Sequence, residues 1–203
     1  MQTKKIVVTN KKASYEEILD LTEKVSADYS LKNKDKLHLR LLAEEMVSMI
    51  EATTGNFDAL FWIEEDSGDF KLCLNAKTQV SSTARKDLLS VSSTGENTAA
   101  RGIMGKIREI IEVGISHYDE IDRMNLQYGS NFYTCGAVGV DAADAMAGSL
   151  FTWSLNQYRD SMEPVHESDA WDEIEKSIVA NIADDVRVGI TSDSVELVIS
   201  KRF

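Results

Sequence analysis

The stretch FDALFWIEEDSGDFKLCLNAK, residues 57–77, decides how this chain folds. Apolar residues alternate on both sides of a short polar centre, which is typical of two β-strands that each bury one face. Ser67 and Gly68 at that centre predict a tight turn, so the stretch is expected to form an antiparallel hairpin. The residues expected on its buried face are Phe57, Ala59, Phe61 and Ile63 on the first strand and Phe70, Leu72 and Leu74 on the second.

A second hairpin is predicted further along the chain. DDVRVGI (184–190) and VELVISKRF (195–203) flank the polar turn TSDS, and Val186, Val188 and Ile190 alternate as the pattern requires. Residues 3–9, TKKIVVT, are rich in β-branched side chains and predict one more short strand.

Helices are expected between these strands. Ser14, followed three positions later by Glu17, predicts a capping box that opens the first helix. A wide apolar stripe predicts a well-buried second helix at residues 35–53. Further helices are expected at residues 84–91, 102–112, 150–162 and 171–183. Strands in antiparallel pairs and grouped helices predict an α+β two-layer sandwich, with a mixed, mostly antiparallel sheet and helices on one face.

Composition narrows the class of protein. The chain has 203 residues, of which 43 % are hydrophobic, so one domain over 1–203 is expected. A net charge of −12 argues against a nucleic-acid partner and against adhesion to anionic lipid. No apolar run reaches the length of a membrane span or a signal peptide, and Cys73 and Cys135 imply no disulfide framework. The expected location is the cytoplasm.

Residues 114–168 are expected to form an insertion within that domain. The first part, up to about residue 150, is rich in Gly, Ala and Tyr and has little periodicity. One hypothesis makes the insertion a partner surface, since aromatic anchors suit interfaces, and allows this protein to form a homo-oligomer through it. The alternative hypothesis is that the aromatic residues of the insertion complete the core of an enlarged domain. The aromatic residues concerned, within the insertion or beside it, are Tyr118, Tyr128, Phe132, Tyr133, Phe151, Trp153 and Tyr158.

Motifs that identify an activity by themselves are absent from the sequence, including a Walker loop, a GxSxG elbow, HExxH and CxxC. His117 in HYDEID would suit a metal, but a solvated acidic turn is the favoured interpretation. Cys135 in YTCGAVG has no neighbouring base and is expected to be inert.

Two further groups carry both a functional and a structural interpretation. Glu44 and Glu45 interrupt an apolar helix. The functional interpretation is that one of them faces a pocket as a general base or a metal-associated carboxylate. The structural interpretation, which the spacing favours, is that both lie at the edge of the buried stripe with their carboxylates in water. Arg101, Gly102, Gly105 and Lys106 surround the start of a helix, where glycines and cations suit an anion. Close packing of the two glycines explains that segment equally well.

Three segments resemble one family. LRLLAEEMVSMIEATTG (39–55) is similar to the N-box helix of the GHKL, or histidine-kinase-like, ATPase superfamily, whose pattern is a glutamate, three residues and an asparagine. SIVANIADDVRVGITSDSVELVISKRF (177–203) looks like that family's final helix and last two strands, and FKLCLNAKT (70–78) takes the place of the strand that ends in its Asp-x-Gly box. The anti-sigma-factor serine kinases are the most similar members. The match covers residues 3–76 and about 173–203, and it implies the histidine-kinase-like fold.

The chain departs from the family at positions that bind nucleotide. Glu45 falls on the family's glutamate, which helps to position or activate water or substrate. The magnesium-binding asparagine is Met49 here, and the adenine-reading aspartate falls at or near Ala76. A thioether does not coordinate a cation that demands oxygen, and a methyl group accepts no hydrogen bond.

The remaining family positions are also altered. Thr78 stands where the family has a glycine, and Gly102, Gly105 and Lys106 are a rough counterpart of the second glycine box. About 60 residues, roughly 113–170, separate that segment from the closing helix, where the family has almost none.

Three functional hypotheses follow. The first is a regulatory module on a degenerate fold, which binds a sigma factor or its antagonist and needs no cofactor. The second is a functional ATP-binding protein, with or without magnesium-dependent serine/threonine kinase activity of the anti-sigma type, so enzyme activity is left open. The third is an unrelated α+β protein whose sheet binds a small molecule.

Overall fold

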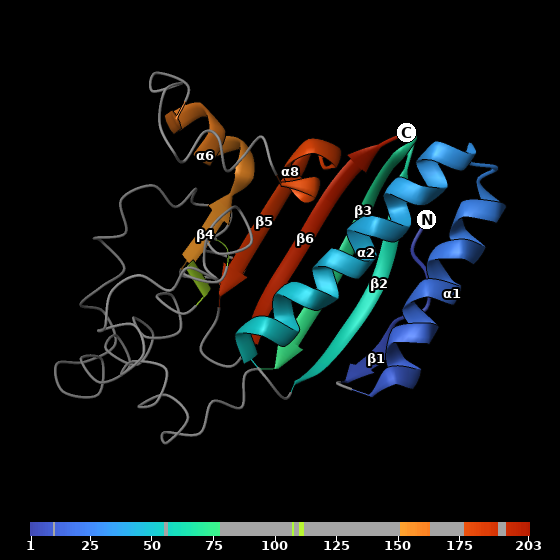
Figure 1. The fold of residues 1–203 in the computed structure, drawn as a ribbon, viewed down its shortest axis with the longest axis horizontal. Coiled ribbons are helices and arrows are strands. Elements are labelled where there is room, and N and C mark those ends of the chain that lie inside the picture. Colours follow the sequence, from blue (N-terminus) through green and yellow to red (C-terminus); the bar gives the residue numbers. More distant parts are fainter. Residues whose placement is uncertain are drawn as a thin grey trace, which may run out of the picture.

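The computed structural model describes residues 1–9, 11–54, 57–77, 107, 110, 111, 151–162, 177–190 and 194–203. In chain order the elements are β1 (Ile6–Thr9), α1 (Lys12–Asp28), α2 (Asn33–Thr54), β2 (Asp58–Asp66), β3 (Asp69–Lys77), β4 (Phe151–Ser154), α6 (Leu155–Met162), α8 (Ile178–Ile182), β5 (Asp185–Ile190) and β6 (Ser194–Arg202). Figure 1 shows the strands as one sheet, with α1 and α2 lying across the same face. The α+β class is therefore confirmed.

The two predicted hairpins are both present and lie side by side. The six-stranded sheet has the order β1-β2-β3-β6-β5-β4, and β3 pairs with β6, with Cys73 opposite Val198. Each of these five pairings is antiparallel, so the described strands do not include the parallel pairing of a mixed sheet.

The turn at Ser67 and Gly68 forms as predicted. Both residues have positive φ, 56° and 89°, which matches the twist of the flanking strands. The Gly68 N–H donates a 2.9 Å hydrogen bond to Oε1 of Glu65. Glycine is required here because few other residues adopt this backbone conformation without strain.

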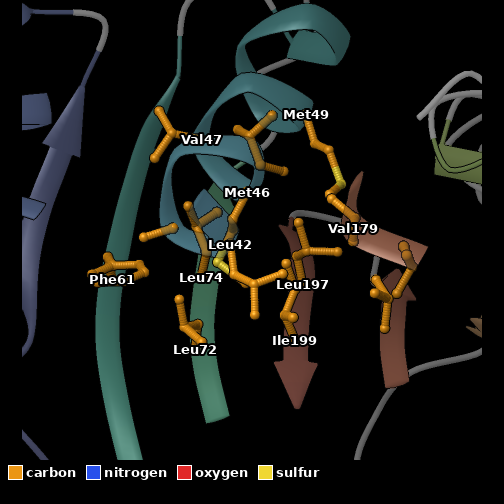
Figure 2. Packing of buried hydrophobic residues seen from close by; sticks show 14 of the residues in the cluster. Leu42, Met46, Val47, Met49, Phe61, Leu72, Leu74, Val179, Leu197 and Ile199 are labelled. Atoms are coloured by element: carbon orange, nitrogen blue, oxygen red, sulfur yellow. The ribbon is translucent and has the colours of Figure 1, made fainter. Parts of the chain in front are cut away.

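The face of the sheet beneath the helices carries the core. On β2 and β3, Phe61, Leu72 and Leu74 are fully buried as the alternation predicts, and on β6 so are Leu197 and Ile199. Figure 2 shows these side chains meeting the underside of α2. The α2 residues in this contact are Leu42, Met46, Val47 and Met49. Burying a side chain of this size contributes about 1.5 to 3 kcal/mol, so this layer holds α2 in place.

The start of α1 differs from the prediction. The helix begins at Lys12, and Lys11 takes the N-cap position without a side-chain hydrogen bond. Ser14 lies inside the first turn, and its hydroxyl is 3.2 Å from the hydroxyl of Thr9 at the end of β1. The predicted capping box of Ser14 and Glu17 is therefore wrong, because Ser14 contacts the preceding strand.

The segment predicted as one helix over 150–162 contains two elements. Phe151–Ser154 form β4, which pairs with β5, and only Leu155–Met162 are helical. Phe151, Thr152 and Trp153 are aromatic or β-branched, and such side chains favour a strand where a sheet edge is open to pairing.

Of the helix predicted at 171–183, residues 177–183 are described, and Ile178–Ile182 of these are helical. Ser177 has extended backbone angles, φ −79° and ψ 124°, and its hydroxyl caps α8 by accepting from the Ala180 N–H at 3.3 Å. Ile178, expected in the apolar stripe, is 51 % exposed, whereas Val179 and Ala180 are buried. The buried side of α8 therefore contains Val179 and Ala180, and the prediction that Ile178 lies in the buried stripe is wrong.

Other predictions lie mostly outside the described residues. The helix expected at 84–91 lies wholly outside them. Of the helix expected at 102–112, Ile107, Ile110 and Ile111 are described; they are helical and buried in the core. Over the part of the chain that the structure describes, no helix has the length and apolar character needed to cross a bilayer.

Candidate functional site

The candidate site lies where α2 and α8 meet above β3 and β6. Met49 projects from the last turns of α2 and is 3 % exposed. Figure 2 shows its side chain extending toward Val179 of α8. Ala76 on β3 is fully buried and lies opposite Val195 of β6. Both positions belong to the same hydrophobic core.

The labelled groups around Met49 are apolar. Met46, Leu197 and Val179 contribute carbon and sulfur atoms to this region (Figure 2). Mg²⁺ demands oxygen ligands in near-octahedral geometry. The side chains of Met49 and Ala76 provide no oxygen ligand. This part of the interior is an apolar contact between α2 and the sheet.

Glu45 and Glu44 occupy different sides of α2. Glu45 is half-buried and precedes Met49 by one helical turn, so both share one side of the helix. Glu44 is held from the other side by Arg40, whose Nε lies 3.1 Å from Oε1 of Glu44. Arg40 also reaches α1, with Nη1 2.8 Å from Oε1 of Glu23. Glu44 is therefore part of an ion-pair network at the surface, the structural interpretation that spacing favoured.

Tyr15 lies beside this network. Partial burial, and then the Glu44 carboxylate, raise the pKa of its hydroxyl. The hydrogen bond to Glu44 likewise raises the pKa of Arg40. Both shifts keep these groups in their ordinary protonation states at neutral pH, so neither becomes an acid or a base for chemistry there.

Asp185 is a buried acid that sequence reasoning missed. Its side chain accepts hydrogen bonds from the Ser154 hydroxyl at 3.0 Å and the Asn156 N–H at 3.2 Å. It also accepts from the Val186 N–H at 2.9 Å and Arg187 Nε at 3.0 Å. These partners fix the junction of β4 and α6 against β5, so the carboxylate has a structural role.

The other face of the sheet contains Cys73 and Trp62, which lie opposite each other on β3 and β2. Burial raises the pKa of the Cys73 thiol to about 12, so it stays neutral and unreactive at physiological pH. The indole N–H of Trp62 donates to Oε1 of Glu64 at 2.8 Å, and Nζ of Lys5 lies 4.1 Å from the centre of its ring.

The structure thus places Glu45 and Met49 on one side of α2, and it places Met49 and Ala76 in one hydrophobic core. Thr78, Gly102, Gly105 and Lys106 lie outside the described residues, as do His117, Cys135 and most of the insertion at 114–168. Within the residues that the structure places, no three His, Cys, Asp or Glu side chains gather as a metal site would require.

Comparison of the chain with protein-family models, with curated proteins and with solved structures finds no match.

Proposed function

We propose that this chain is a regulatory protein-binding module, built on a degenerate histidine-kinase-like fold of the anti-sigma type. The observation that carries the proposal is the burial of Met49, at the position where the resemblance expects an asparagine that binds magnesium. A thioether packed toward Val179 supplies no oxygen ligand to a cation.

Ala76 supports the same conclusion. The resemblance expects an aspartate that accepts a hydrogen bond from adenine at or near this position. Ala76 is fully buried and has no side-chain acceptor. A nucleotide here would lose both its base-reading group and its metal ligand.

The arrangement of the sheet is the second line of support. The resemblance requires the last hairpin to lie beside the hairpin at residues 57–77, with helices on one face. The pairing of β3 with β6 and the position of α1 and α2 agree with this requirement (Figure 1). Folds of this kind host many activities, so the site residues decide between them.

The proposed partner is a sigma factor or a protein that antagonises one. This choice follows from the resemblance to anti-sigma-factor kinases. A net charge of −12 agrees with a protein partner in place of nucleic acid.

A functional ATP-binding protein or serine/threonine kinase is the second candidate, and Glu45 is the observation that favours it. Its carboxylate is half-buried and lies one turn before Met49, where the family has its glutamate. This glutamate is the one nucleotide-site residue of the family that the described chain retains.

Thermal unfolding with Mg-ATP or Mg-ADP separates the two candidates. A ligand at one hundred times its Kd stabilises by about 2.7 kcal/mol, which would raise the Tm by about 5 °C or more. The regulatory module predicts no change of Tm at millimolar nucleotide. A clear increase that disappears in Glu45→Ala would establish the second candidate and overturn the first.

The partner is tested separately with the full chain as bait. Purified sigma factors and their antagonists from the source organism are each titrated against the immobilised chain. Saturable binding without nucleotide supports the proposal. Failure of every one of them to bind overturns the anti-sigma assignment, whatever the nucleotide experiment shows.

A further inference from the structure

We draw no further inference here: the strongest candidate, the apolar patch of Val7, Leu60 and Trp62 on the face of the sheet away from α1 and α2, has nothing in the described part of the chain to show what covers it.

Discussion

Oδ1 of Asp185 accepts a 3.0 Å hydrogen bond from the hydroxyl of Ser154, and this contact joins two strands that meet at one edge of the sheet. The same oxygen accepts from the N–H of Asn156 in the first turn of α6. Asp185 is only 8 % exposed, yet its carboxylate is well supplied with donors. One buried acid therefore sets the direction in which α6 leaves β4.

Removing this acid should destabilise the protein. Asp185→Ala leaves the Ser154 hydroxyl and the Asn156 N–H without their acceptor, and we expect the free energy of unfolding to fall by about 2 to 3 kcal/mol. Urea unfolding measures the change. Asp185→Asn keeps an oxygen at this position and should cost less; an equal loss from both variants would contradict the assigned hydrogen bonds.

The contact between α2 and the sheet makes a second prediction. Leu42 is fully buried, so Leu42→Ala should lower the free energy of unfolding by about 2 to 5 kcal/mol through lost burial and a cavity. Leu60 is 40 % exposed on the other face of the sheet, and Leu60→Ala should cost no more than about 1 kcal/mol. Thermal or urea unfolding of both variants measures these losses. If α2 did not cover the face that contains Leu72 and Leu74, Leu42→Ala would cost no more than Leu60→Ala.

The burial of the Cys73 thiol predicts that it reacts slowly in the folded protein and that stability depends on pH in the alkaline range. Burial raises its pKa from 9.0 to about 12, so the folded state holds the proton more tightly than the unfolded state. This contribution to stability is complete below pH 9 and is lost as the pH rises toward 12.

Alkylation with iodoacetamide is the measurement for Cys73. A Cys135→Ser variant isolates the Cys73 thiol. In this variant we expect slow labelling at pH 8 in the folded state and rapid labelling in urea. Equal rates in both conditions would mean that Cys73 is accessible in the native protein.

Glu65 leads us to expect that the stability of the protein falls at acid pH. The Gly68 N–H, and then the Tyr29 hydroxyl, hold the pKa of this carboxyl below its usual 4.5. The stabilisation is present above pH 4.5 and is lost as the pH falls through the lowered value. We expect Glu65→Gln to have a lower Tm at neutral pH and the same Tm as the natural chain in strong acid. A constant difference across this range would rule out the ionised carboxylate as the cause.

The strand pairs and the long helix were predictable because each satisfies a local rule. Residues 57–77 alternate strictly around a turn that needs positive φ, and residues 33–54 carry a wide apolar stripe. Such patterns fix which face is buried without knowledge of the rest of the molecule.

The predictions were wrong where contacts between distant parts of the chain determine the local structure. Ser14 and Glu17 match a capping box, but Thr9 engages the Ser14 hydroxyl. Phe151–Ser154 continue into a helix, and only the open edge of β5 makes them a strand.

The candidate site shows the same division between local and long-range information. The burial of Met49 followed from its position in the apolar stripe. The role of Asp185 depends on Ser154, 31 positions away, and no local pattern signals a contact of that range.

The position of β6 has a consequence for how the protein is made. This strand, residues 194–202, lies between β3 and β5 and supplies the middle of the sheet. During synthesis, the hairpin of β2 and β3 leaves the ribosome long before its neighbour exists. Its unpaired side then exposes main-chain groups to other nascent chains. Closure of the sheet between β3 and β5 must wait for β6, so premature termination before residue 194 should yield aggregation-prone fragments in place of a smaller folded protein.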